Sequence, residues 1–61
     1  SRGDGVRWIQ YMLDVAGYDC GKIDGIAGVK TIAAIRAYQQ AHGLAVDGLA
    51  GKKTVAALVG E

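Results

Sequence analysis

A segment of thirteen residues occurs twice in this chain of 61 residues. Residues 23–35 and residues 46–58 are identical at eight positions and exchange one aliphatic residue for another at four more. Only the pair Val29 and Lys52 differs in kind. Each copy contains the pattern Asp-Gly-x-x-Gly-x-x-Thr, where x is any residue. Because an internal repeat indicates one structural unit used twice, the fold is expected to have two similar halves.

Each copy of the pattern predicts a turn that leads into a helix. Asp-Gly is a strong turn dipeptide, because the Asp side chain caps the turn and Gly adopts a positive φ. The second Gly stands where a helix needs its N-cap. Thr31 and Thr54 then fall in the first helical turn, where a Thr hydroxyl can reach unpaired backbone groups. Ile26 and Leu49 are expected to point inward.

Hydrophobic periodicity around these turns predicts three helices, so the fold class is all-α. The first helix is expected to begin after Asp4, a good N-cap, and to continue to about Ala16. Gly17 then supplies the C-terminal stop. The second helix is expected over residues 29–41 and the third over residues 52–59. The third helix has barely two turns, so its stability must come from tertiary packing.

Two glutamines extend the repeat upstream of the turns. Gln10 stands in the first helix, fourteen residues before Asp24, and Gln39 stands in the second helix, eight residues before Asp47. Two helix–turn–helix halves therefore share the middle helix, which predicts a pseudo-symmetric three-helix domain with Asp-Gly loops. Both amides fall near core faces, where a buried amide must be paired. They pair with loop carbonyls and amides or else contact a ligand.

The first helix is apolar on two sides. One stripe has the spacing of a core face and consists of Val6, Ile9, Leu13 and Ala16. The opposite stripe consists of Trp8, Tyr11, Met12 and Val15. A helix with two apolar sides is either sandwiched between other elements or displays a binding surface.

Composition and charge exclude several classes of protein. The net charge is +1 and no helix has a basic stripe, so nucleic acid is not an expected partner. No window of 18 apolar residues occurs, which excludes a membrane span and a membrane partner. A chain of this length forms at most one domain. That domain is expected over residues 5–61, as a monomer, after a flexible segment of residues 1–4.

The residues that could carry catalysis are few and scattered. One Cys, one His and six acidic residues, most of them in caps and turns, provide neither a metal triad nor paired acid and base groups. We therefore expect no catalytic residue, no metal and no cofactor, and the chain is not expected to be an enzyme.

The order of these features resembles the peptidoglycan-binding domain that is found beside amidases, muramidases and phage endolysins. The resemblance covers residues 5–59 and rests on both Asp-Gly loops, both glutamines and the aliphatic residues between them. The matching positions are Val6, Ile9, Gln10, Leu13, Gly17, Tyr18, Ile23, Asp24, Gly25, Gly28, Thr31, Tyr38, Gln39, Gly43, Leu44, Val46, Asp47, Gly48, Gly51, Thr54 and Leu58. The chain departs from the family at Ala27 and Ala50, where an aromatic residue is frequent, and at Val29 and Lys52, where Pro is frequent.

The resemblance implies an orthogonal three-helix bundle that binds peptidoglycan through its glycan strand, its stem peptide or both. It also implies that the module tethers an attached catalytic domain, a hydrolase, to the bacterial cell wall. The place of action would then be the cell wall, the periplasm or the extracellular space, or the wall attacked by a phage-encoded lysin. Some members occur in protease propeptide regions. The alternative is therefore a protein-interaction or propeptide-like domain that uses the face of Trp8 and Tyr11.

Six residues are candidates for ligand contact: Trp8, Tyr11, Tyr18, Asp24, Tyr38 and Asp47. Aromatic rings stack on sugar faces, and their polar groups can hydrogen-bond stem peptides. A simple bundle does not obviously need the first three, although Trp8 could instead cover the third helix or the C-terminal tail. The two aspartates bind ligand amides or cap their own turns. Tyr38 belongs to the core or to a cleft wall with its hydroxyl toward the groove.

Overall fold

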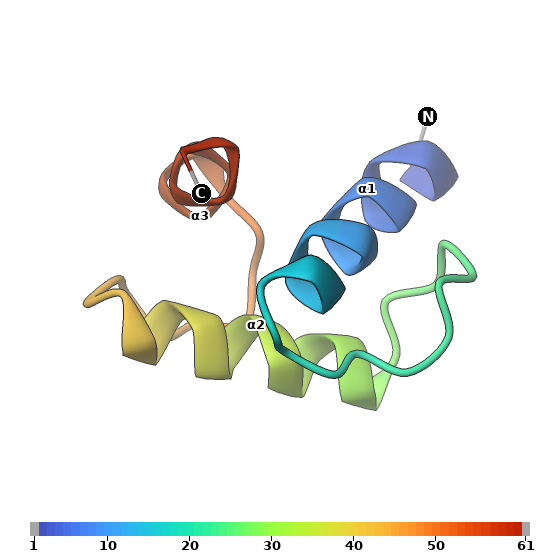
Figure 1. The fold of residues 1–61 in the computed structure, drawn as a ribbon, viewed down its shortest axis with the longest axis horizontal. Coiled ribbons are helices and arrows are strands. Elements are labelled where there is room, and N and C mark those ends of the chain that lie inside the picture. Colours follow the sequence, from blue (N-terminus) through green and yellow to red (C-terminus); the bar gives the residue numbers. More distant parts are fainter. Residues whose placement is uncertain (1, 61) are drawn as a thin grey trace.

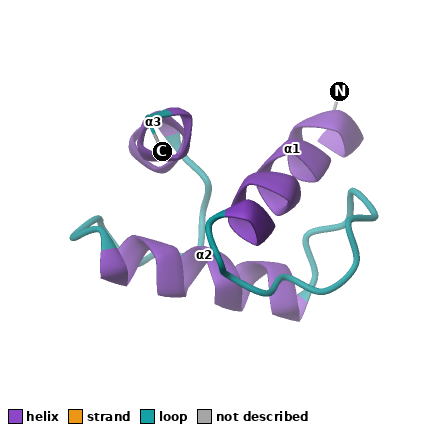
Figure 2. Cartoon of the chain, in the orientation of Figure 1, coloured by secondary structure: helices purple, strands orange, loops and turns teal. Residues whose placement is uncertain are grey.

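The protein is built from three α-helices and the loops between them (Figure 1). The computed structural model describes residues 2–60, with helix α1 over Arg2–Val15, α2 over Val29–Ala41 and α3 over Lys52–Val59. Helices and loops account for the whole of this described part, and it contains no strand (Figure 2). The fold is therefore a small all-α three-helix bundle, as the sequence predicts.

The three helices cross steeply instead of lying side by side. In Figure 1, α2 lies across the view, α3 is seen along its axis, and α1 is oblique to both. Contacts join α1 to α2 and α1 to α3, so α1 is the element against which the other two helices pack. This is the orthogonal arrangement that the family resemblance implies. Within residues 2–60, no helix combines the length and the apolar character needed to cross a membrane.

The predicted bounds of α2 and α3 are confirmed, and those of α1 need a correction. This helix begins at Arg2, so the expectation that it begins after Asp4 is wrong. The first backbone N–H groups of a helix have no intrahelical acceptor in any case. The helix continues through the glycines of its first turn at a cost of roughly 1 kcal/mol each. The expected flexible segment, residues 1–4, includes Ser1, which lies outside the described residues, and stays a prediction.

Helix α1 ends at Val15, and Gly17, the glycine that the sequence singles out, forms the turn that follows. Gly17 has a φ of 95°, a left-handed conformation that a residue with a side chain rarely adopts. Its turn lets the Tyr18 N–H donate to the Leu13 carbonyl oxygen at 2.8 Å, while the Gly17 N–H donates to the Asp14 carbonyl oxygen at 3.0 Å. These two bonds form a Schellman motif. They satisfy carbonyls at the helix end and direct the chain back across α2.

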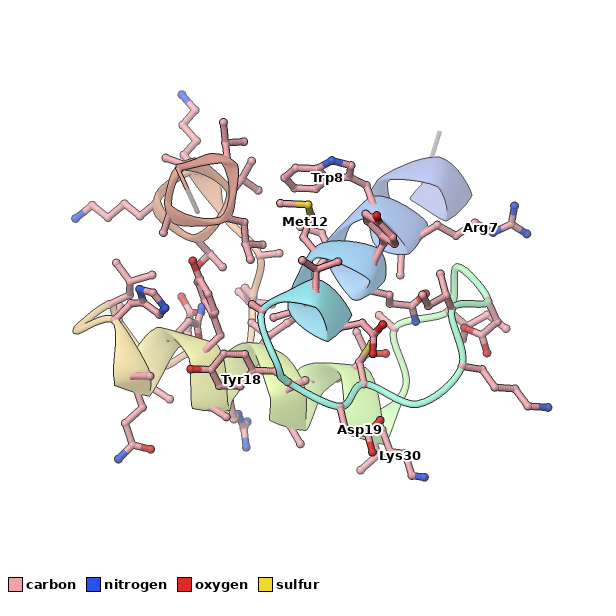
Figure 3. The ribbon with its side chains drawn as sticks, in the orientation of Figure 1. Arg7, Trp8, Met12, Tyr18, Asp19 and Lys30 are labelled. Carbon is pink, nitrogen blue, oxygen red and sulfur yellow. The ribbon has the colours of Figure 1, made fainter. Side chains whose placement is uncertain are left out.

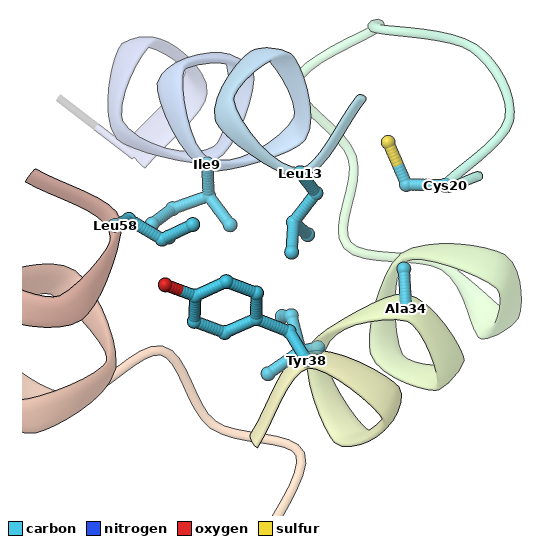
Figure 4. Close-up of a cluster of buried hydrophobic side chains, with 7 residues drawn as sticks. Ile9, Leu13, Cys20, Ala34, Tyr38 and Leu58 are labelled. Carbon is cyan, nitrogen blue, oxygen red and sulfur yellow. The ribbon is translucent and has the colours of Figure 1, made fainter. Parts of the chain in front are cut away.

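The hydrophobic core lies where the three helices meet. It consists of Ile9, Leu13, Cys20, Ala34, Ile35, Tyr38 and Leu58. Figure 4 shows the ring of Tyr38, from α2, between Leu13 of α1 and Leu58 of α3. Each of these three side chains is completely buried. The ring of Tyr38 and the core residues of α1 together provide the packing surface that holds the short helix α3.

The two apolar stripes of α1 have different environments. The predicted core face is confirmed, since Leu13 is fully buried, whereas Tyr11 and Val15 on the other stripe are 56% and 65% exposed. Trp8 and Met12 extend from α1 toward α3 (Figure 3). The second stripe is therefore displayed at the surface over much of its length rather than sandwiched between elements.

The longer loop, between α1 and α2, is held to the helix by Cys20. Its thiol is buried and donates a hydrogen bond to the Gln10 carbonyl oxygen at 3.3 Å. Burial raises the pKa of the Cys20 thiol, and the charges of Asp14, Asp19 and Asp24 raise it further. The thiol therefore stays protonated and acts as a small apolar anchor for the loop.

Removal of core volume is expected to destabilise the bundle strongly. Leu13→Ala should lower the free energy of unfolding by about 2–5 kcal/mol, because it deletes buried methyl groups and leaves a cavity beside Tyr38. Urea denaturation followed by circular dichroism measures this change. The control Val15→Ala removes an exposed side chain from the same helix and should change stability by no more than about 0.5 kcal/mol. Equal effects of the two substitutions would contradict this description of the core.

Candidate functional site

The first motif loop, residues 24–28, is held by the side-chain amide of Gln10. The Gln10 Oε1 accepts a hydrogen bond from the Gly25 N–H at 3.0 Å. The Gln10 Nε2 donates to the Ile26 carbonyl oxygen at 3.0 Å, to the Thr31 hydroxyl oxygen at 3.0 Å and to the Asp24 carboxylate at 3.3 Å. An amide nitrogen has two hydrogens, so the three acceptors share them. One buried side chain thus joins α1, the loop and the start of α2.

The second motif loop, residues 47–51, bonds to Gln39 in the corresponding way, with one additional backbone N–H donor. The Gln39 Oε1 accepts from the Asp47 and Gly48 N–H groups at 3.1 and 3.0 Å. The Gln39 Nε2 donates to the Asp47 carboxylate and the Leu49 carbonyl oxygen, each at 2.9 Å, and to the Thr54 hydroxyl oxygen at 3.0 Å. Of the two alternatives for the glutamines, pairing with loop groups is the one observed. These amides are structural.

The second motif loop also requires glycine for steric reasons. Gly48 is buried and has a φ of 73°. A Cβ atom added there would lie 3.1 Å from the Ile32 Cγ2 and 3.1 Å from the Arg36 Nε. The loop backbone therefore packs directly on the side chains of α2. A larger residue would strain the turn and push the loop away from the helix.

The two aspartates cap their own turns. The Asp24 Oδ1 accepts from the Ile26 N–H at 2.9 Å, and the Asp47 Oδ1 accepts from the Leu49 N–H at 2.9 Å. These backbone bonds, followed by the bonds from Gln10 and Gln39, lower the pKa of both carboxyl groups below the ordinary value of 3.8. Turn capping is thus observed. Whether the remaining carboxylate oxygens also bind ligand stays a prediction.

The motif threonines have a different partner from the one expected. Their hydroxyl oxygens accept hydrogen bonds from the glutamine amides. At the N-caps of the two helices that follow, Gly28 and Gly51, no side-chain cap hydrogen bond is present. Both threonines are buried, and the glutamine amide is the group that donates a hydrogen bond to each hydroxyl oxygen. Each threonine fixes the start of its helix through a side chain of the preceding helix.

The apolar residues inside the motif loops point outward, contrary to expectation. Ile26 and Leu49 are 67% and 68% exposed. The reason is the hydrogen bonding of the loop backbone: the carbonyl groups of both residues face the glutamine amides. With the carbonyl oxygen directed inward, the side chain is left at the surface. The prediction that these two residues are part of the core is wrong.

Of three cavities that border the motif loops in the described part of the chain, the largest is an apolar groove of about 490 Å³, which we call the Trp8 groove. It lies between α1, the first half of α2 and the second motif loop. Its main apolar side chains are Val6, Trp8, Ile32, Ile35, Leu49 and Val55. Both motif loops contribute to it, the first through Ala27 and the second through Gly48, Leu49 and Ala50. Its volume lies within the range of roughly 300–1,000 Å³ that is typical of ligand sites.

The six candidate residues do not form one site. Trp8 lines the groove and is 37% exposed, so its indole can reach both the groove and the solvent. Tyr11 does not line the groove, although it lies on the same helix. Tyr18 is half-buried and packs edge-on against Tyr38, with ring centroids 5.5 Å apart. Its environment is that of the core margin rather than of the groove (Figure 3).

The other three candidates lie in the core or at separate depressions. Tyr38 is completely buried, and its ring also stacks on His42 with centroids 4.1 Å apart. Asp24 lines a depression of about 270 Å³ beside the first motif loop, and Asp47 one of about 200 Å³ beside the second. Trp8 is therefore the one candidate placed at the largest cavity. Ligand contact by these six residues stays a prediction.

Sequence reasoning did not find most of the residues that line the groove. Ile32, Ile35 and Val55 have the spacing of core residues, and nothing in the sequence distinguishes a groove wall from a core wall. Ala27 and Ala50 did carry a signal. They are the positions at which the related family often has an aromatic residue, and both line the groove. Small side chains at these two positions leave space that aromatic rings would fill.

Comparison with known proteins establishes the family. A family model described as a peptidoglycan binding domain matches residues 2–58. The match covers nearly the whole chain, so the protein belongs to this family, as the sequence resemblance predicts. This membership supports peptidoglycan as the ligand and the cell wall or the extracellular space as the place of action. Comparisons with the curated proteins and with the solved structures gave no match.

Loss of a motif glutamine is expected to unfold part or all of the domain. Gln39→Leu removes the partner of two loop N–H groups, a carbonyl and a hydroxyl. It should lower the free energy of unfolding by about 2–4 kcal/mol, since each buried hydrogen bond contributes roughly 1 kcal/mol and unpaired groups add a penalty. Gln40→Leu makes the same change at an exposed neighbour. Urea unfolding should show almost no effect for this control, and an equal loss would contradict the role given to Gln39.

The stability of the domain is expected to fall in acid because of the two motif aspartates. Their pKa values are lower in the folded chain than the ordinary value of 3.8. The unfolded chain therefore binds protons first, so the stabilisation is present above pH 3.8 and is lost as the pH falls through the folded values. Thermal unfolding between neutral and strongly acidic pH measures this. A double variant, Asp24→Asn with Asp47→Asn, should show a smaller decrease, and an unchanged decrease would refute the assignment.

Proposed function

We propose that this protein is a non-catalytic module that binds peptidoglycan in the Trp8 groove and tethers an attached hydrolase to the bacterial cell wall. Family membership supports the ligand. The observation that supports the groove as the site is a partly exposed indole at the edge of the largest apolar cavity. An aromatic face beside an apolar depression can stack on the C–H face of a sugar ring while its N–H stays available for a hydrogen bond.

The motif loops support the fold of the module more directly than ligand contact. In each loop one aspartate oxygen is already bonded to a backbone N–H and a glutamine amide. Using these groups to bind a ligand would take them from the turn, and the loop would lose its cap. The Trp8 groove has no such internal demand on its exposed side chains. It is therefore the better candidate for the binding surface.

The titratable groups of the described residues also support a binding role. The three groups with a shifted pKa are Cys20, Asp24 and Asp47. The first is a buried anchor whose pKa is raised chiefly by burial, and the other two cap turns and have their pKa lowered chiefly by backbone hydrogen bonds. Catalytic acid–base groups would be expected as a pair with opposed shifts in one cleft. In this proposal an attached hydrolase domain carries out catalysis. That domain acts in the bacterial wall, in the periplasm or outside the cell, or it belongs to a phage-encoded lysin.

A second function is favoured by the exposed stripe on α1. Tyr11 and Val15 lie outside the groove and are more than half exposed. A protein-interaction or propeptide-like domain could use these residues together with Trp8 against a partner domain, because exposed aromatic and aliphatic side chains are typical anchors of protein interfaces. The two functions require different residues of α1, which makes them separable by substitution.

Sedimentation with purified, insoluble peptidoglycan tests the proposal. Wild-type protein should sediment with the wall. Trp8→Ala should reduce the bound fraction by roughly tenfold, a loss of the size expected when an aromatic anchor is truncated. Tyr11→Ala is the matched control, an aromatic residue on the same helix that does not line the groove, and it should bind like wild type.

The other outcomes have distinct meanings. Absence of sedimentation by folded wild-type protein would refute peptidoglycan binding. Binding that is lost with Tyr11→Ala but kept with Trp8→Ala would move the site from the groove to the exposed stripe. Circular dichroism of each variant shows whether the fold is retained.

A further inference from the structure

We infer that the Trp8 groove takes the uncharged, N-acetylated face of the glycan strand and not the stem peptide. This inference rests on the proposed function and names the part of the polymer that occupies the groove.

The wall of the groove is apolar and carries no charge on the described residues that line it. Thr31 is the one hydroxyl among them, and it is buried and already bonded to Gln10. The charged side chain of Arg36 lies beside Gly48, but Arg36 itself does not line the groove. A charged ligand group would therefore lose water in this groove without gaining a partner of opposite sign, which is unfavourable.

The stem peptide and the glycan strand of peptidoglycan differ in charge. The stem peptide has free carboxylate and amino groups along its length. The sugars of the glycan strand carry acetamido groups, which are neutral and end in a methyl group. Methyl groups and sugar C–H faces suit a wall of Val6, Ile32, Ile35 and Val55, because burial of apolar surface is favourable and needs no specific partner. The indole of Trp8 at the edge adds a flat surface for a sugar ring.

The small residues of the two motif loops fit the same ligand. Ala27 and Ala50 line the groove from opposite loops, and each presents only a methyl group. The space beside them remains open instead of being filled by larger side chains. An acetamido group is a short, flat substituent that such a space can accept. The recognised feature is therefore expected to be the acetyl group itself.

Trp8 is the single tryptophan of the chain, so its fluorescence reports directly on the groove. The protein is titrated with a β-1,4-linked hexamer of N-acetylglucosamine, with the same hexamer lacking its acetyl groups, and with free stem pentapeptide. The pH is acidic enough to protonate the amines of the deacetylated sugar. The acetylated hexamer should give a saturable change, and the deacetylated hexamer should bind at least roughly tenfold more weakly because its charges are uncompensated in the groove. The stem pentapeptide should leave the fluorescence unchanged.

A charge introduced into the groove provides the second arm. Ala27→Glu places a carboxylate at the groove and should reverse the preference toward the cationic, deacetylated hexamer. Ala33→Glu makes the same change at an exposed position of α2 outside the groove, and it should keep the preference of the wild type. Arg36→Gln should also leave binding of the acetylated hexamer unchanged. If the Arg36 guanidinium instead bound carboxylates of the ligand, the wild-type protein would bind the stem pentapeptide better than the acetylated hexamer.

Equal binding of the two hexamers, or saturable binding of the stem pentapeptide alone, would overturn the inference. Its failure can be distinguished from failure of the proposed function. If wild-type protein sediments with whole peptidoglycan in a Trp8-dependent manner but the acetylated hexamer does not change the fluorescence, the groove binds another part of the polymer. If neither binding is observed, the proposed function is wrong as well.

Discussion

The fold depends on a buried glutamine amide that holds an Asp-Gly loop, and it uses this interaction twice. Gln10 and Gln39 each bond to loop backbone, to an aspartate and to a threonine at the start of the next helix. The loops have no large side chain directed into the core, because Ile26 and Leu49 face outward. Hydrophobic burial therefore contributes little to their position. The hydrogen bonds must be satisfied in a single arrangement, since an unpaired group in the buried amide network is costly.

The same interaction explains how so short a helix is retained. Helix α3 has eight residues, too few to be stable alone in water. Leu58 gives it one fully buried side chain against Tyr38. The bond from Gln39 to Thr54 fixes its other end to α2. With both ends held, α3 brings Val55 to the lining of the Trp8 groove. The polar network thus helps to position the apolar groove, to whose lining it contributes the buried Thr31.

The features that depend on local hydrophobic periodicity and on burial rules could be predicted from the sequence. Apolar spacing located α2 and α3 at their observed bounds, and the requirement that a buried amide be paired anticipated the role of Gln39. The prediction that Ile26 and Leu49 face the core is wrong, because an apolar residue in a loop need not point inward. Their direction is set by a hydrogen bond to a residue distant in sequence. The groove could not be predicted either, since its lining residues come from all three helices and both motif loops, which approach only in the folded chain.

The two halves share a loop network but differ at the position that distinguishes the groove. Trp8 lies two residues before Gln10, and the corresponding position before Gln39 is occupied by Ala37. A flat aromatic surface is therefore present beside one glutamine and replaced by a methyl group beside the other. If the repeated motif itself bound ligand, both halves would offer equivalent sites. Because the motif groups are engaged internally and the indole occurs once, we propose a single binding groove, in which the repeat supplies an alanine from each loop and Trp8 supplies the flat surface that the second half lacks.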